Sequence, residues 1–218
     1  DEGLLWVNHE YLHSLLVSGV FKPGDKTKEQ ILKEKLVVGG SVVHIRRVGK
    51  KWEYVKDKER NHRFTALYPE IQMTGPAREK VPMGKGTLAN CSGGKTPWNT
   101  VLTCEENFNG YFRGPKAPSA DQKRYGFTEN GFGYRWHEFD ERFDLNLHPN
   151  EANRFGWVVE IDPWHPEKAP VKRTALGRFK HEGATVTQAR DGRVVIYMGD
   201  DERFEYIYKF VSKERYIV

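Results

Sequence analysis

Cysteine is scarce in this sequence, which contains only Cys91 and Cys104. Two cysteines are too few for a disulfide framework, so a small fold held together by disulfides is excluded. Three uses remain open for the two thiols: a bond with each other, burial in the core, or metal binding.

Long apolar runs are also absent. No segment approaches the roughly 20 apolar residues that a helix needs to cross a bilayer, so we expect no membrane-spanning helix. The first seven residues, Asp1 to Val7, have neither the positive start nor the apolar core of an export signal. Either the protein is cytosolic, or such a signal lies outside this stretch.

An uninterrupted basic block is missing too, although the net charge is +5 and the pI is about 9.1. Lys and Arg are scattered among Asp and Glu, and no recognition helix or aromatic RNA-binding motif accompanies them. We therefore expect no nucleic-acid partner. The surplus positive charge can instead attract small anionic substrates.

The sequence does have 38% hydrophobic and 13% aromatic residues in 218, which suits a folded chain with one substantial core or several repeated sheets. Segments rich in β-branched and aromatic residues recur between Gly, Asp and Pro, which predicts strands. The predicted strands are 4–7, 42–48, 52–55, 101–104, 157–161, 194–198 and 206–211. Turns at 49–51 and 191–192, and the acidic stretch 200–204, predict three hairpins.

One helix is predicted over residues 28–36. Thr27 and Gln30 have the spacing of a capping box, and Ile31, Leu32 and Leu36 fall on one face. We expect this helix to be short and peripheral. Residues 108–154 are polar and aromatic without a period, which predicts a long irregular insertion that covers a surface or a site.

Many short strands with hairpin turns predict an all-β fold, either a barrel, a sandwich or a propeller. The strand clusters recur at about the 40 to 50 residues of one propeller blade, which favours a β-propeller. A chain of this length supplies only about three to four blades. We therefore interpret residues 1–218 as part of a single β-propeller domain with an incomplete set of blades, and as a fragment of a longer chain.

Residues 9–13 match the H-E-x-x-H pattern of zinc proteases. On a helix, His9 and His13 would share a face and bind zinc, while Glu10 would activate water. The strand predicted directly before this segment weakens that interpretation, as does the lack of a third ligand at a recognised spacing. A zinc metalloprotease that uses His9, Glu10 and His13 is therefore the lesser alternative.

The segment 90–98 contains Cys91, Gly93 and Gly94, and is followed by Glu105 and Glu106. The glycines let the backbone approach a ligand closely, and the thiol lies one strand away from adjacent carboxylates. The run Gly-Gly-Lys-Thr resembles a phosphate loop, but the upstream glycine spacing is wrong and no helix is predicted after it. A buried cysteine and a tight turn is the plainer explanation of this segment taken alone.

Acidic residues gather again at Glu182 and at Asp200, Asp201 and Glu202. Clustered carboxylates repel one another unless a cation or an arginine compensates, and hard oxygen ligands of this type suit Ca²⁺. A solvated acidic turn is the alternative for these residues.

Together these segments resemble the PhoX family of bacterial alkaline phosphatases. The resemblance runs in order through residues 7–11, 90–98, 103–107, 156–163, 172–184 and 197–201, over nearly the whole chain. Its most specific part is the Cys91 loop with Thr-Cys-Glu-Glu at 103–106, combined with Lys-His-Glu-Gly at 180–183.

The resemblance implies a β-propeller that holds iron and calcium at its axis and hydrolyses phosphate monoesters outside the cytoplasm. We therefore expect Fe³⁺ and Ca²⁺ as cofactors, small phosphate esters as substrates, and a periplasmic or secreted protein. Carried onto this sequence, Cys91 is implied as a thiolate ligand to iron, Glu182 as a carboxylate ligand, and Asp201 as a calcium ligand. The further implied metal ligands are Glu105, Glu106, Glu10 and Asp200.

Members of that family are much longer, and the Arg, Lys and later acidic residues of their phosphate site lie beyond the matched stretch. We therefore expect this chain alone to be catalytically incomplete, with the remaining segment of the same propeller as its partner. The main alternative is a calcium-stabilised propeller module that binds partners without catalysis. Such a module has no need of iron at Cys91, so metal content distinguishes the two.

Overall fold

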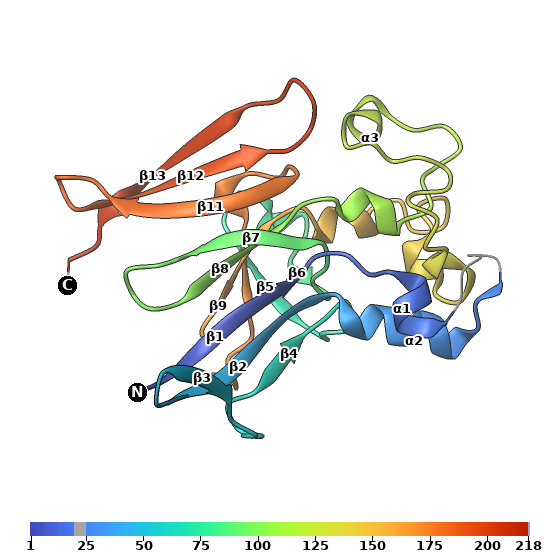
Figure 1. Cartoon of the computed structure of the whole chain (residues 1–218). Helices are drawn as coiled ribbons and strands as arrows, with labels where there is room; N and C mark the ends of the chain where they lie inside the picture. The colour runs from blue at the N-terminus through green and yellow to red at the C-terminus, as the bar shows by residue number, and fades with distance from the viewer. Residues whose placement is uncertain (20–24, 218) are drawn as a thin grey trace.

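The computed structural model describes residues 1–19 and 25–217, and it is mostly β with few helices (Figure 1). The strands are β1 (Glu2–His9), β2 (Gly39–Val48), β3 (Lys51–Tyr54), β4 (His62–Phe64), β5 (Ile71–Thr74), β6 (Met83–Gly84), β7 (Asn90–Lys95), β8 (Val101–Glu105), β9 (Val158–Ile161), β10 (Val171–Arg173), β11 (His181–Gln188), β12 (Arg193–Asp200) and β13 (Ile207–Arg215). The α-helices are α1 (Ser14–Ser18), α2 (Lys28–Val37) and α3 (Ala120–Arg124). Short 3₁₀ helices lie at Pro76–Glu79, Phe108–Tyr111, Trp136–Glu138, Glu141–Phe143, Glu151–Arg154 and Thr174–Leu176. No helix in the described part of the chain is long and apolar enough to cross a membrane.

The strands form three sheets. The first sheet has the order β1-β2-β3, with β4 also paired to β2, and the second has the order β6-β5-β10-β9-β8-β7. The third sheet has the order β11-β12-β13. All pairs are antiparallel except β5 with β10, which run parallel.

The three predicted hairpins are confirmed. Val48 pairs with Lys51 across the turn between β2 and β3, and Gly49 there has the positive φ of 61° that such a tight turn requires. The turn that contains Gly192 joins β11 to β12, and the acidic loop after Asp200 joins β12 to β13.

The central strand β9 shows how the sheets pack on one another. Val158 lies in an apolar cluster with Leu102 of the second sheet and Ile196 of the third, whereas its neighbour Val159 lies in a cluster with Val42 of the first sheet. Because successive side chains of a strand point to opposite faces, β9 is covered on both sides. The second sheet therefore lies between the first and the third.

The capping box of α2 is confirmed, but the predicted apolar face is wrong. Gln30 donates its backbone N–H to the Thr27 hydroxyl at 3.3 Å, and Thr27 donates its own to the Gln30 side chain at 2.8 Å. Ile31 is buried, whereas Leu32 and Leu36 are 49% and 46% exposed. The buried side of the helix instead carries two charged side chains with partners: Glu34 pairs with Lys26 and accepts from the Trp136 indole, and Lys35 pairs with Asp140.

The insertion 108–154 does more than cover a surface, because its side chains form a core of their own. The cluster is largely aromatic and also takes in Leu12 of the segment after β1 and Ile31 of α2. Its aromatic members are Phe108, Tyr111, Phe112, Phe127, Trp136, Phe143 and Phe155. The insertion lies beside the sheets, at the end where β1 and β2 meet α1 and α2 (Figure 1).

Candidate metal centre

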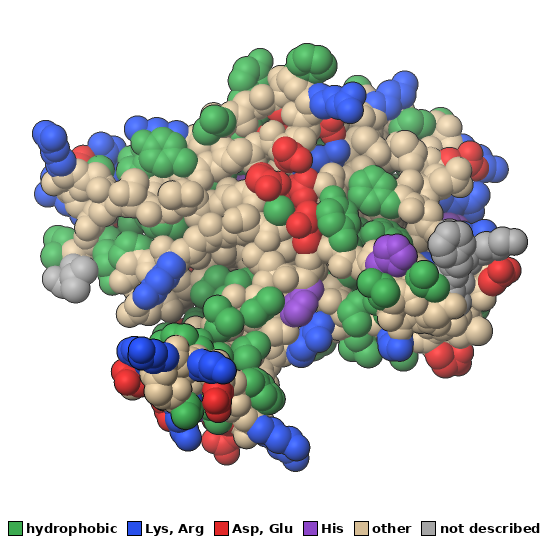
Figure 2. Space-filling view, in the orientation of Figure 1, with side chains coloured by type: hydrophobic (Ala, Val, Ile, Leu, Met, Phe, Trp, Pro, Cys, Tyr) green, Lys and Arg blue, Asp and Glu red, His purple; other side chains and the backbone are tan. Residues whose placement is uncertain are grey.

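Acidic side chains and one thiol converge from all three sheets. Glu10 follows β1 directly, Glu106 follows β8, and Asp201 follows β12, while Cys91 lies in β7 and Glu182 lies in β11. They form two groups that share Glu106: Glu10, Cys91 and Glu106 in one, and Glu106, Glu182 and Asp201 in the other. Within each group, ligand atoms of the three residues lie within 4.8 Å of one another. Figure 2 shows acidic side chains gathered at the centre of this face, near the ends of β7 and β11 in Figure 1.

Both of the strand residues in the centre lie where the regular pairing is interrupted. The register of β7 against β8 shifts between Asn90 and Gly93, on either side of Cys91. The register of β11 against β12 shifts between His181 and Gly183, on either side of Glu182. Such irregularities redirect a side chain away from the ordinary alternation, and here they bring the thiol and the carboxylate together.

The paired glycines of β7 serve the packing of strands. A Cβ on Gly93 would lie 1.9 Å from the Leu102 carbonyl oxygen of β8, and one on Gly94 would lie 2.0 Å from the Ala184 carbonyl oxygen of β11. The glycines therefore let β7 approach both neighbours, where the sequence predicted close approach to a ligand. The tight turn considered for this segment is replaced by a strand, and the loop-like Gly-Gly-Lys-Thr run lies partly within it.

The centre is electrostatically unfavourable as a bare group of side chains. Burial, a hydrogen bond with Glu10, and the charges of Glu10, Glu182 and Asp201 raise the pKa of Glu106 to about 8. Burial and contact with the Glu182 carboxylate likewise raise the pKa of the Cys91 thiol. Within residues 1–19 and 25–217, no Lys, Arg or His forms an ion pair with the four carboxylates of the two groups.

These residues fit a cation centre. Carboxylate oxygens are the donors that Ca²⁺ prefers, whereas a thiolate favours a softer metal such as iron. A metal ion would supply the positive charge that the described side chains do not supply, and it would favour the ionised forms of Glu106 and Cys91.

Asn107 orients Glu106 and itself contacts Tyr11 next to the centre. The Asn107 side-chain amide donates to the Glu106 carboxylate and, at 2.6 Å, to the Tyr11 hydroxyl. Burial and the nearby charge of Glu106 raise the pKa of Tyr11 to about 12. Tyr11 and Asn107 were not predicted as site residues, although both adjoin predicted ligands and lie in segments 7–11 and 103–107 of the family resemblance.

Glu105 lies outside both groups. Its carboxylate is fully buried and pairs with the buried Lys172 ammonium at 2.7 Å. It also accepts the backbone N–H groups of Gly156 and Trp157, at 3.0 and 3.2 Å. With its oxygens committed to these donors, Glu105 anchors the end of β8, contrary to its expected role as a metal ligand.

Asp200 also lies outside both groups. It pairs with Arg124 at 3.5 Å and accepts the backbone N–H of Glu202 at 3.2 Å, and its side chain is only 2% exposed. The structure therefore places Asp200 in the support of the loop that carries Asp201, whereas the sequence predicted a metal ligand.

A model of the alkaline phosphatase PhoX family matches residues 1–218. The chain belongs to the PhoX alkaline phosphatase family. The resemblance predicted from the sequence is thereby confirmed.

A solved structure of Pseudomonas fluorescens PhoX in complex with vanadate, a transition state analogue, is 42% identical in sequence to this chain, with a TM-score of 0.92. The match covers 99% of this chain and 39% of that PhoX chain, so this chain spans well under half the length of its solved relative. No curated protein matches it.

The zinc-protease alternative is wrong for this PhoX-family chain. His9 ends the strand β1, and its ring nitrogen contacts the Ser41 hydroxyl at 2.8 Å. His13 precedes α1, so the two histidines do not share a helix face, and Glu10 belongs to the acidic centre. Sequence spacing alone could not reject the motif. The motif binds zinc only when its residues form a helix, and no helix forms over residues 9–13.

The remaining sequence candidates have structural roles. Cys104 is buried in the cluster between the second and third sheets, and both cysteines are free. His181 is buried against Phe179, with its ring nitrogen 3.0 Å from the Gly177 carbonyl oxygen, and burial lowers its pKa to about 4. His181 is thus a neutral packing residue beside Glu182.

Proposed function

We propose that this chain supplies the metal centre of a phosphomonoesterase, an alkaline phosphatase that releases inorganic phosphate from small organic phosphate esters. The convergence of four carboxylates and a thiol, with no cationic partner among the residues that the structure describes, carries the proposal. Membership of the PhoX family supports it, as does the similarity to a PhoX that binds vanadate as a transition state analogue. The activity would belong to a longer protein, because the chain covers 39% of that relative.

Fe³⁺ and Ca²⁺ are the proposed cofactors. The thiolate of Cys91, with Glu10 and Glu106, would hold iron, and the all-carboxylate group with Glu182 and Asp201 would hold calcium. Such cations, when bound, polarise the phosphoryl oxygens and make a nucleophile available near neutral pH. Glu106 would contact both sites, and Asn107 would keep its carboxylate in place between them.

The larger architecture is proposed to be a β-propeller to which the three sheets contribute successive blades. The support is their order in space, with the second sheet packed between the first and the third. The partner would be the remaining segment of the same propeller, and the compartment would be the periplasm or the outside of the cell. A structure of the longer protein in which the three sheets do not surround one axis would contradict this architecture, and cell fractionation tests the compartment.

Metal content and hydrolysis together test the function. The full-length protein is analysed for iron and calcium and assayed with a chromogenic phosphate ester, next to the variants Glu106→Gln and Glu70→Gln. Glu70 is an exposed glutamate without an ion pair among the described residues, so its variant controls for the loss of one charge. We expect Glu106→Gln to lose both metals and at least about a hundredfold in kcat, and Glu70→Gln to match the wild type.

Two results would overturn the proposal. A protein that contains calcium without iron and hydrolyses no ester would instead be a calcium-stabilised binding module. A Glu106→Gln variant with unchanged metal content and unchanged hydrolysis would show that the centre is not the site of the reaction.

A further inference from the structure

The loop between β12 and β13 is strongly acidic. It follows Asp200, the last residue of β12, and contains Asp201, Glu202 and Glu205, so four carboxylates fall within six residues. Asp201 reaches the metal centre, and its backbone N–H donates to the Lys180 carbonyl oxygen at 3.0 Å. The other three acidic side chains must be held away from Asp201 and compensated if the loop is to keep one shape.

Two basic residues provide that compensation in the described part of the chain. Lys180, directly before β11, pairs with Glu202. Arg124 comes from the distant insertion and pairs with Asp200 at 3.5 Å and with Glu205 at 3.0 Å. Both contacts are made by the same terminal nitrogen, so Arg124 ties the two ends of the loop to one positive charge.

Arg124 is presented by a helix that has its own local supports. Helix α3 begins with a capping box in which the Gln122 backbone N–H donates to the Ser119 hydroxyl at 3.2 Å. Just after the helix, the Tyr125 hydroxyl donates to the Arg178 carbonyl oxygen at 3.1 Å, and the Gly126 carbonyl accepts from Asn109 at 2.9 Å.

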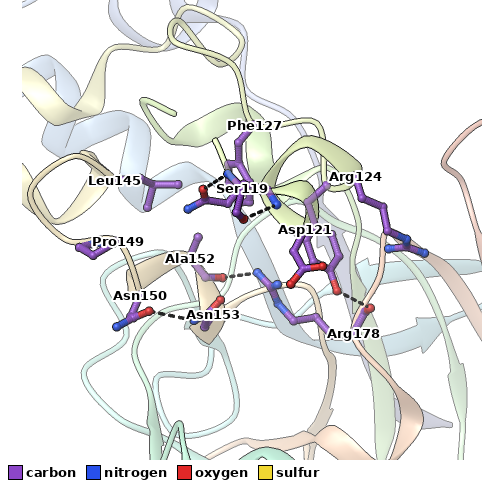
Figure 3. Close-up of a pocket in the computed structure, with 12 residues that line it drawn as sticks. Ser119, Asp121, Arg124, Phe127, Leu145, Pro149, Asn150, Ala152, Asn153 and Arg178 are labelled. Atoms are coloured by element: carbon purple, nitrogen blue, oxygen red, sulfur yellow. Dashed lines mark hydrogen bonds between the residues drawn. The ribbon is translucent and has the colours of Figure 1, made fainter. Parts of the chain in front are cut away.

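The rest of α3 lies over open space. A cavity of about 560 Å³ separates it from the segment 145–153, and no residue of α3 itself is buried. In Figure 3 the Arg124 side chain extends away from Ser119 and the side chains across the cavity. The position of helix α3 therefore depends on the contacts at its carboxyl end. Among these contacts, Arg124 makes the ones to the acidic loop.

We propose that Arg124 is a positioning residue for the proposed metal centre: it fixes the β12–β13 loop so that Asp201 meets Glu106 and Glu182. The insertion 108–154 would thus control the order of a site to which α3 contributes no ligand. This inference rests on the proposed function, because it takes the group of Glu106, Glu182 and Asp201 to be a cation site.

A positioning role and simple charge repulsion predict opposite changes in cation affinity when Arg124 is removed. Removing a positive charge near a cation site strengthens cation binding if the charge acts only through space. Removing Arg124 should weaken cation binding, because a loop that loses its tether must be ordered when the cation binds. Lys123 is the matched control, since it is an exposed neighbour on the same helix without an ion pair among the described residues.

The experiment titrates Ca²⁺ into chelator-treated protein by isothermal titration calorimetry, for the wild type, Arg124→Gln, Arg124→Lys and Lys123→Gln. We expect about fivefold weaker binding in Arg124→Gln, and affinity within about twofold of the wild type in Arg124→Lys, whose ammonium still reaches one carboxylate. We expect Lys123→Gln to bind Ca²⁺ as tightly as the wild type or slightly more tightly. Hydrogen exchange should quicken at the backbone amides of residues 201–206 in metal-free Arg124→Gln, with the same thermal midpoint within about 2 °C.

Each other outcome counts against the inference. Arg124→Gln binding as tightly as the wild type, or more tightly, would show that Arg124 acts only as a competing charge. An equal loss in Lys123→Gln would show that the effect is one of net charge. A wild-type protein that binds no Ca²⁺ would overturn the proposed function as well, which separates that failure from a failure of Arg124 alone.

Discussion

The adjacent glutamates 105 and 106 should respond in opposite ways to the same conservative substitution. Glu105 and Lys172 form a 2.7 Å ion pair in which both side chains are fully buried, and Lys172 also donates to the Arg154 carbonyl oxygen at 2.7 Å. Glu105→Gln leaves the buried ammonium without its anion, which typically costs about 3 to 5 kcal/mol. Glu105 contributes nothing to the two metal groups, so the metal content should not change.

Glu106→Gln should instead stabilise the metal-free protein and abolish metal binding. A pKa of about 8 in place of the ordinary 4.5 corresponds to about 5 kcal/mol of unfavourable interaction when Glu106 is ionised. Glu182 and Asp201 are exposed, so solvent screens much of this repulsion, and we expect a gain of about 1 to 2 kcal/mol at pH 8.

Urea unfolding at pH 8 with a chelator, paired with metal analysis without it, separates the two roles. The variants Lys172→Met and Glu105→Gln/Lys172→Met complete a double-mutant cycle, in which the double variant should be more stable than the sum of the two single losses implies. If Glu105→Gln lost metal while unfolding like the wild type, the assignment of Glu105 to the ion pair would be refuted. If Glu106→Gln lost stability and kept its metals, the assignment of Glu106 to the metal centre would be refuted.

Three further outcomes follow from the geometry. Cys91→Ser should lose iron and keep its Ca²⁺ affinity within about threefold, because the thiolate belongs to only one of the two groups. Elemental analysis and calorimetry measure the two effects, and loss of calcium alone would contradict the assignment. Gly94→Ala should lower the free energy of unfolding by about 1 to 3 kcal/mol and reduce the metal content, because its Cβ would push β7 away from β11. The control Gly3→Ala, whose Cβ would have nothing within 4 Å, should have little effect in the same urea series. In chelator, the folded chain holds a proton on Glu106 that the unfolded chain has released, so the free energy of unfolding should fall as pH rises from about 6.5 to about 8. Below pH 6.5 the buried neutral His181 has the opposite effect, so the test is the upper window, where a wild-type profile parallel to that of Glu106→Gln would refute the reasoning.

Most of the strands that the sequence predicted have side chains that enter the apolar clusters; the exception is β3, whose four residues are all exposed. Strand β9 is an example, because Val158 is buried on one face and Val159 and Ile161 on the other, so three of its four residues are apolar. Strand β7, from Asn90 to Lys95, has no such pattern, because its glycines pack through the backbone. Propensity therefore indicated a turn where tertiary contact makes a strand.

The α2 helix illustrates the same limit for charged residues. Its cap is local and was predicted correctly, but its buried face was not. Glu34 and Lys35 are buried because the insertion supplies Trp136 and Asp140 as partners, and those partners lie about a hundred residues away in sequence. Hydrophobic periodicity cannot anticipate a buried charged side chain whose partner comes from a distant irregular segment.

The choice between Glu105 and Glu106 shows why the site could be predicted only in outline. Neighbouring residues at a strand end point in different directions, so a step of one residue separates a buried anchor from a member of the centre. The sequence Thr-Cys-Glu-Glu does not show which of the two glutamates faces the core and which faces the metal centre. Lys172 decides between them, because a buried ammonium needs a buried carboxylate as its partner. This contact with Glu105 exists only because β10 belongs to the second sheet, which the sequence did not predict.

Because the centre draws its residues from three sheets, cation binding and the packing of those sheets are linked. The first and third sheets are joined to the second by apolar clusters that do not include Glu106, and the packing in these clusters opposes the repulsion among the carboxylates. A cation that binds only the assembled centre adds stability by mass action, about 2.7 kcal/mol when its free concentration is a hundred times its Kd. That gain is comparable with the screened cost of ionising Glu106, so the bound cation offsets the repulsion that the side chains alone leave uncompensated.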